Sequence, residues 1–181
     1  ERFDYYYDRV GVPEVPEGYF ENMPEPMQKW REARGITDLT EEEIRTARAG
    51  YYGIVEHFDA VVGRLLESLE EAGIADNTIV AYVSDHGDSA GKNGLWWKSQ
   101  FYDHAVGVPM IFSGPGIPPG LRVEQVVSLL DLGPTLTEMA DAPQIPDLSG
   151  QSMVSLMQGE GTDWRDEALS EMIGLGPRYP Y

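Results

Sequence analysis

The longest hydrophobic pattern in the chain runs through residues 40–72 and predicts a helix. Apolar side chains recur there at intervals of three and four over more than about six turns: Ile44, Ala47, Tyr51, Ile54, Val55, Phe58, Val61, Val62, Leu65, Leu66 and Leu69. Thr40 and Glu43 have the spacing of a capping box, and Gly73 is a stop signal. We expect the part of this stripe from Ile54 to Leu65 to be buried against a sheet.

Two short apolar runs predict the strands of that sheet. Residues 78–84 read TIVAYVS, a nearly continuous β-branched run typical of a central parallel strand. Residues 108–114, VPMIFSG, predict a second buried strand. The pattern then predicts a short strand, a helix, a short helix and an edge strand, at residues 122–128, 129–140, 152–157 and 166–173. The mixture of helices and strands indicates α/β organisation.

The first part of the chain has a different character. Residues 1–36 are rich in proline and aromatic side chains, and proline at that density prevents long helices and sheet interiors. We expect these residues to form an irregular segment that wraps across a larger surface, with one short helix at 26–33. The α/β domain then occupies residues 37–181.

Composition excludes several classes of function. The chain has 31 acidic and 13 basic residues and a net charge of −18, which disfavours binding to nucleic acid or to an anionic membrane. It contains no cysteine, which rules out disulfides, thiolate metal sites and a cysteine nucleophile. It has neither an apolar run of the roughly 20 residues that a membrane span needs nor a signal-peptide pattern, so the compartment stays open.

The candidate chemistry follows the strand at 78–84. In open α/β sheets, ligands bind beyond the carboxyl ends of strands, which is where Asp85 and His86 stand. A carboxylate and an imidazole on adjacent residues can reach one divalent cation where the backbone turns sharply, and Gly87 permits such a turn. The alternative is that Asp85 caps the next segment and His86 has no special role.

A loop containing several glycines leads from this pair to Lys98. Because of these glycines, we expect the loop to fold back over the strand end. An ammonium near a metal suits a doubly charged oxyanion substrate such as sulfate or phosphate, contacted by both. At least one of Trp96 and Trp97 is expected to pack in the core. His57, on the predicted helix, is interpreted as a packing or surface histidine.

The residues around these positions resemble those of a known family. Residues 76–117, DNTIVAYVSDHGDSAGKNGLWWKSQFYDHAVGVPMIFSGPGI, are similar to the C-terminal half of the core of type I sulfatases in the alkaline phosphatase superfamily, whose members commonly read D-N-T-[IV]-[IV]-[IV]-[FY]-x-S-D-[HN]-G-[DE]. The spacing from DHG to GLWWK is most like choline-sulfatase and phosphonate-monoester-hydrolase members. Residues 40–160 match the family in order, which is more specific than any single motif.

The resemblance implies a fold and a site. The fold would be a partial alkaline-phosphatase-like α/β sandwich with a central mixed sheet flanked by helices, truncated at both ends. Asp85 and His86 would be ligands of one divalent metal ion, calcium or manganese, and Lys98 would contact the sulfate or phosphate oxygens. His104 lies where the family has an acidic or small residue and is given a structural role, and Gly107 replaces the family's arginine.

Part of the family's site has no counterpart in this sequence. No residues match [CS]-x-[PA]-x-R, whose first residue becomes the formylglycine nucleophile, nor the Asp-Asp strand that supplies further metal ligands. No catalytic residue is therefore expected in this segment, and formylglycine is expected only in an N-terminal part that is not present here.

Three readings of the function remain. The first is a fragment of a metal-dependent sulfatase that acts on small sulfate esters and is inactive alone. The alternatives are a phosphonate monoester or phosphodiester hydrolase of the same superfamily, and a degenerate binding module. A flavodoxin-like domain would need a glycine-rich phosphate loop, which is absent from the sequence. Homo-oligomerisation stays open.

Overall fold

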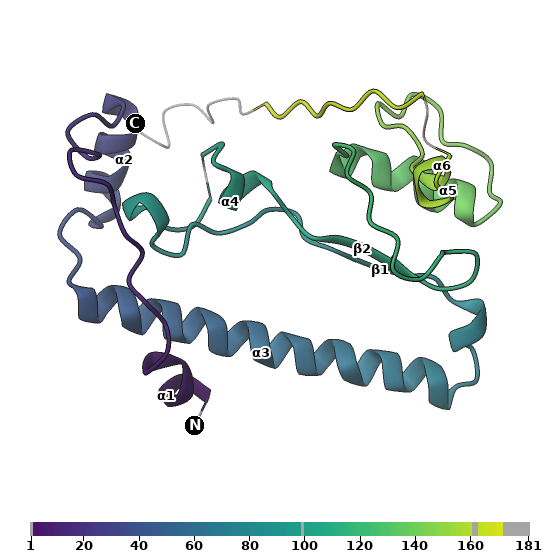
Figure 1. Cartoon of the computed structure of the whole chain (residues 1–181), viewed down its shortest axis with the longest axis horizontal. Helices are drawn as coiled ribbons and strands as arrows, with labels where there is room; N and C mark the ends of the chain where they lie inside the picture. The colour runs from purple at the N-terminus through teal and green to yellow at the C-terminus, as the bar shows by residue number, and fades with distance from the viewer. Residues whose placement is uncertain (1, 99, 161–162, 172–181) are drawn as a thin grey trace. The chain divides into compact units, whose positions relative to one another are not determined.

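The computed structural model describes residues 2–98, 100–160 and 163–171. The described residues form two compact units. One unit holds residues 2–74 and 86–109 and contains the helices α1 to α4 (Figure 1). The other holds residues 75–85 and 110–171 and contains the two strands and the helices α5 and α6.

The long helix α3 spans Glu41–Glu71, which confirms the helix predicted from the periodicity. Its capping box is formed as the sequence indicates. The Glu43 backbone N–H donates to Thr40 Oγ1 at 3.2 Å, and the Thr40 N–H donates to Glu43 Oε2 at 2.8 Å. These hydrogen bonds from Thr40 favour the charged carboxylate and lower the pKa of Glu43 below its usual value. The helix ends before Gly73, whose φ of +67° is left-handed.

The expected burial of the α3 stripe is wrong for this chain. Ile54 is 69% exposed and Leu65 is 57% exposed, and Ala49 is the buried residue of the helix. A helical repeat of apolar residues identifies the face that is suited to packing, but it does not supply the surface that covers that face. The short helix α1 (Arg2–Tyr7), which the proline-rich composition did not predict, packs along α3 through a stack of Tyr6 on Tyr52 at 5.7 Å.

The core of this unit lies around α2, Glu25–Arg34, close to the short helix predicted at 26–33. Its buried members are Met23, Trp30, Ile36 and Leu95, and the last of these comes from the loop that follows His86. Arg31 is also buried, and its guanidinium donates to the carbonyl oxygens of Gly94 at 3.1 Å and Ile36 at 3.3 Å. Burial lowers the pKa of Arg31 from its usual value.

The sheet consists of β1 (Val80–Val83) and β2 (Met110–Ser113), which pair antiparallel with Val80 opposite Ser113 and Val83 opposite Met110. The expectation of parallel pairing for β1 is therefore wrong among the described residues. An apolar run indicates burial but carries no information on the direction of the neighbouring strand. Residues 122–128 and the described part of 166–173, which are residues 166–171, are not strands.

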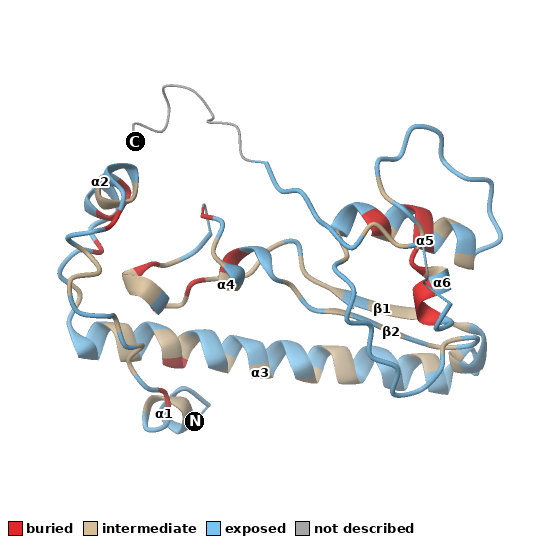
Figure 2. Cartoon of the chain, turned by 45° about the horizontal axis from the view of Figure 1, so that its top comes forward, coloured by how far each residue is buried: buried red, intermediate tan, exposed pale blue. Residues whose placement is uncertain are grey.

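The helices predicted after the sheet are present. A short 3₁₀ turn, η3 (Leu129–Asp131), leads into α5 (Leu132–Met139), and α6 spans Val154–Met157. The remaining short elements are the turns η1 (Ala75–Asn77) and η2 (Lys92–Gly94) and the helix α4 (Asp103–Val106). Figure 2 shows the buried parts of α5 and α6 in red. Met153, Leu156 and Met157 form a cluster with Met110 and Phe112 of β2.

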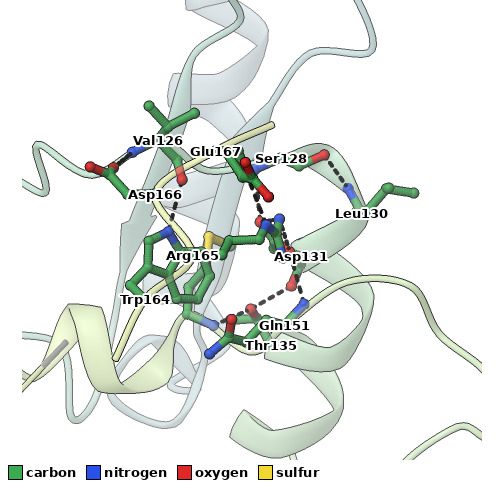
Figure 3. Close-up of polar contacts among 11 residues, drawn as sticks. Val126, Ser128, Leu130, Asp131, Thr135, Gln151, Trp164, Arg165, Asp166 and Glu167 are labelled. Carbon is green, nitrogen blue, oxygen red and sulfur yellow. Dashed lines mark hydrogen bonds and ion pairs between the residues drawn. The ribbon is translucent and has the colours of Figure 1, made fainter. Parts of the chain in front are cut away.

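A buried carboxylate holds the loops of this unit together (Figure 3). Asp131 is fully buried, and Arg165 Nη2 contacts both its oxygens, at 2.7 and 2.6 Å. The backbone N–H groups of Ser128 and Gln151 donate to the same carboxylate, each at 2.8 Å. Thr135 extends the network, because its hydroxyl donates to the Asp131 backbone carbonyl at 2.5 Å and accepts from the Met153 N–H at 2.9 Å. One side chain thus joins three separate segments.

Candidate functional site

The loop from His86 to Lys98 folds back on itself. The Ser89 N–H donates to Trp97 O at 2.9 Å, and the Gly91 N–H donates to Leu95 O at 2.9 Å. These bonds form an antiparallel ladder closed by η2. The ladder sets the register, because pairing Ser89 with Trp97 returns the next residue, Lys98, toward the start of the loop.

His86 and Lys98 meet in this arrangement. Lys98 Nζ is hydrogen-bonded to His86 Nε2, and His86 Nδ1 lies 2.9 Å from Gly87 O. One tautomer satisfies both contacts: a neutral imidazole whose Nδ1–H donates to the carbonyl oxygen and whose Nε2 lone pair accepts from the ammonium. The Nε2 lone pair of His86 and the ammonium of Lys98 are therefore directed toward each other.

Gly87 has a different role from the one expected. Its φ lies outside the left-handed region, so no special backbone turn requires glycine there. Instead, its N–H donates to Ala105 O at 2.8 Å, and a Cβ at this position would lie only 2.1 Å from His104 O. The close approach of two backbone segments excludes any side chain at residue 87, and it fixes the chain directly after His86.

Buried and half-buried polar groups that could not be identified from the sequence support the loop. Arg48 of α3 donates to Ala90 O, and Arg31 of α2 donates to Gly94 O. Ser89 and Gln100 are buried and bonded to each other. The sequence of a charged helix does not indicate which arginine side chain is directed into the protein. The acceptors for Arg48 and Arg31 are backbone carbonyls, and these reach their positions only when the loop is folded.

The two tryptophans anchor the loop to the core, as expected for at least one of them. Trp96 packs against the cluster around the fully buried Leu95. The ring of Trp97 meets Trp30 edge-on at 6.0 Å, although Trp97 remains 47% exposed. Trp97 adopts a φ of +60°, a conformation that is uncommon for a bulky side chain.

His104 packs within the same unit. Its ring stacks on Tyr102 at 5.4 Å, and Tyr102 shares a hydrogen bond of 2.7 Å with Tyr19. Burial, and after it the positive charge of Lys92, lower the pKa of His104 below its usual 6.5, opposed by the carboxylates of Asp103 and Asp88. Burial and the Tyr102 hydrogen bond raise the pKa of Tyr19 to about 12. These contacts fit the structural role predicted for His104.

The predicted metal ligands lie in different units. Asp85 belongs to the unit that holds the sheet and is exposed, whereas His86 and Lys98 belong to the other unit. The imidazole is suited to a metal, because metal-bound histidines usually donate their second N–H to a carbonyl or carboxylate, as His86 Nδ1 does. The described residues contain no cluster of three or more metal-ligating side chains, so further ligands would be needed.

His57 is exposed on α3, and its ring nitrogen Nδ1 lies 3.4 Å from Arg2 Nη1, which confirms the prediction of a packing or surface histidine.

A hollow of about 1130 Å³ lies between β2, the turn at 114–125 and α6. None of the three predicted site residues, Asp85, His86 and Lys98, lines it. No helix in the described parts of the chain has both the length and the apolar character of a membrane span.

Comparison with known proteins gives one consistent result. Residues 13–142 match the family model for sulfatases. The chain is 37% identical over 125 residues to a choline-sulfatase of Rhizobium meliloti, which covers 67% of this chain and 24% of that protein. It is 39% identical over 119 residues to arylsulfatase K of Mus musculus, which covers 66% of this chain and 22% of the relative. The chain thus spans about a quarter of the length of these curated relatives.

The solved structures agree on the fold. A phosphonate monoester hydrolase from Silicibacter pomeroyi superimposes on 88% of this chain and 34% of its own, with a TM-score of 0.78 and 30% identity. The observed mixture of helices and a small antiparallel sheet is therefore part of the alkaline-phosphatase-like fold, as the residues around DHG indicated.

Proposed function

Because the chain belongs to the sulfatase family of sulfuric ester hydrolases, we propose that it forms part of the catalytic domain of a metal-dependent hydrolase of small sulfate esters. In this proposal Asp85 and His86 hold a divalent cation, calcium or manganese, together with ligands from residues outside this chain. Lys98 contacts the anionic oxygens of the ester. The observation that carries the proposal is the contact of Lys98 Nζ with His86 Nε2.

The contact suggests how a cation held by His86 and the ammonium of Lys98 could both bind the same anion. When bound, the cation would polarise an ester oxygen and neutralise developing charge. Lys98 would then turn from the imidazole to the oxyanion and donate charge-assisted hydrogen bonds to it. His86 would keep its orientation, because Gly87 O holds its Nδ1–H. The loop ladder, anchored by Arg48 and Arg31, would limit how far Lys98 can move.

Hydrolysis of phosphonate monoesters is a second candidate, supported by the similarity to the Silicibacter pomeroyi enzyme. A sulfate monoester and a phosphonate monoester each carry one negative charge, so a site built on one lysine and one cation does not separate them by charge. Groups that contact the alcohol part of the ester would decide between them. We assign those groups to segments outside this chain.

The proposal also requires a nucleophile from elsewhere, since the sequence contains no cysteine and no serine in the family's pattern. The 181-residue chain alone is expected to hydrolyse neither a nitrophenyl sulfate nor a nitrophenyl phosphonate ester with added manganese or calcium. Metal-dependent turnover by the purified chain that is lost in Asp85→Ala would contradict this expectation.

Lys98 can be tested in a chimera in which this chain replaces the matching stretch of the choline-sulfatase. Lys98→Ala should lower kcat/KM by about 10²–10³-fold, the usual effect of removing a group that stabilises a developing oxyanion. Lys92, an exposed lysine in the same loop, is the matched control, and Lys92→Ala should have little effect. Equal losses in the two variants would show that the loop as a whole, and not the Lys98 ammonium, matters.

A further inference from the structure

The loop that carries Lys98 reverses direction at Asn93 and Gly94. The Leu95 N–H donates to Lys92 O at 3.0 Å and closes the turn. Both central residues have a positive φ, +57° for Asn93 and +65° for Gly94. Turns of this kind favour Asn followed by Gly, because Asn tolerates the left-handed region better than most side chains and Gly enters it without steric cost. The backbone of the turn therefore accounts for both residue types.

Packing makes glycine at residue 94 a strict requirement. A Cβ at this position would lie 2.5 Å from two carbons of the Phe20 ring. The ring is held in place by Arg31, whose guanidinium carbon lies 3.8 Å from the ring centroid and whose Nε donates to Gly94 O at 3.1 Å. A side chain at residue 94 would have to displace this packed pair, so the fold requires glycine directly after Asn93.

An asparagine followed by glycine is chemically labile, and we propose that Asn93 is a site of spontaneous deamidation that the folded loop suppresses. The Gly94 backbone nitrogen attacks Cγ of Asn93 and forms a new N–Cγ bond. The bond between Cγ and the side-chain nitrogen breaks, and ammonia leaves with the Gly94 amide proton. Water then opens the resulting succinimide at one of its two carbonyl carbons and gives aspartate or isoaspartate. A side chain on the attacking residue would hinder the first step, and glycine has none.

The observed conformation prevents the ring from closing. Closure requires Cβ of Asn93 and the next backbone nitrogen to eclipse each other about the Cα–C bond, which corresponds to a ψ of about −120° because substituents on a tetrahedral Cα are about 120° apart. Asn93 has a ψ of 24°. The rotation would break the bond from the Gly94 N–H to Gly91 O, which is 3.1 Å long, and would turn Gly94 O away from Arg31. Deamidation therefore needs local opening of the loop.

The isoaspartate product would alter the loop permanently. Its backbone runs through the former side-chain carbons of residue 93, which adds one carbon to the chain between residues 93 and 94. The lengthened turn would no longer match the bonds that pair Gly91 with Leu95 and Ser89 with Trp97. This chemistry is independent of the function proposed for Lys98.

Two other asparagines of the sequence are internal controls, Asn22 before Met23 and Asn77 before Thr78. The 181-residue chain is incubated at a mildly alkaline pH, folded or in guanidinium chloride, and deamidation of each asparagine is followed by peptide mass spectrometry. In denaturant, Asn93 should react at least about tenfold faster than either control. In the folded chain, Asn93 should react at least about tenfold more slowly than in denaturant. Equal rates at the three asparagines in denaturant, or equal rates for Asn93 in the two states, would overturn the proposal.

Arginine substitutions test whether the loop contacts provide the protection. Arg31→Met removes the bond to Gly94 O and should speed deamidation of Asn93 in the folded chain by roughly tenfold. The matched control is Arg45→Met, because Arg45 donates to Val10 O at 2.7 Å and not to the loop, and this variant should leave the rate unchanged. If Arg31→Met does not fold, Arg48→Met, which removes the bond to Ala90 O, takes its place. Equal rates in the loop variant and in the control would overturn the protective role of these contacts.

Hydrogen exchange tests the effect of the product on the loop. The Ser89 and Gly91 amides, which donate to Trp97 O and Leu95 O, should lose protection in the purified isoaspartate form of the chain. Protection equal to that of the unmodified chain would show that the turn accommodates the extra carbon, and it would overturn the predicted change in the loop.

Discussion

The buried Asp131 carboxylate allows a quantitative prediction, made with Arg165→Met. Methionine keeps much of the aliphatic bulk of the side chain and removes the guanidinium that contacts both oxygens of Asp131 at 2.7 and 2.6 Å. The fully buried carboxylate would keep two backbone donors, Ser128 N–H and Gln151 N–H, but would lose its counter-ion. Removal of one partner from a buried ion pair typically costs about 3–5 kcal/mol.

We expect the free-energy cost of Arg165→Met to lie at the lower end of this range. The Arg165 side chain is 27% exposed, so water can replace part of the lost interaction. A cost of about 3 kcal/mol corresponds to roughly a hundredfold increase in local opening, since about 1.4 kcal/mol equals a factor of ten. Hydrogen exchange of the peptides that contain the Ser128 and Gln151 amides measures this opening directly. Arg122→Met, which removes an exposed arginine of the same unit, is the control.

A second substitution tests the sign of the effect. Asp131→Asn in the Arg165→Met background removes the uncompensated charge, and the double variant should be more stable than Arg165→Met alone. A change of less than about twofold in the exchange rate of Arg165→Met would refute the reasoning. Leaving a buried carboxylate without its counter-ion should carry a substantial free-energy cost. A double variant less stable than Arg165→Met would refute the role given to charge.

Three further predictions concern residues between β1 and β2. Gly87→Ala should destabilise the chain by about 1–3 kcal/mol in urea unfolding, since its Cβ would lie 2.1 Å from His104 O, and an unchanged midpoint would contradict that close approach. Leu95→Ala should cost about 2–5 kcal/mol because Leu95 is fully buried, whereas a loss below about 1 kcal/mol would mean that the loop does not share the core. The pKa of His104 is lower in the folded chain than its usual 6.5, so the stability it contributes is present above about pH 6.5 and is lost as the pH falls toward the folded value. The urea concentration at the unfolding midpoint should therefore decrease as the pH is lowered from about 7 to about 5, and His104→Gln should weaken this dependence. If the parent chain and His104→Gln showed the same pH dependence, it would belong to other groups.

The sequence alone determined the elements whose signals are local. The capping box of Thr40 and Glu43 and the apolar repeat that follows it defined α3, because a helix is held by bonds between residues four apart. The glycines between His86 and Lys98 likewise indicated a loop that folds back, and the two side chains do meet. The order of motifs around DHG identified the family, since order over a long stretch is far more specific than any one motif.

Tertiary structure decided the features that depend on distant partners. An apolar run such as residues 80–83 has the same composition beside a parallel or an antiparallel neighbour, so the antiparallel pairing with β2 could not be read from it. Arg31 and Arg165 look like ordinary surface arginines in sequence, and they turn inward because folding presents buried carbonyls to one and a buried carboxylate to the other. The exposure of Leu65 has the same origin. Periodicity selects the face of a helix, whereas burial requires a second surface, and that surface is a property of the assembled fold.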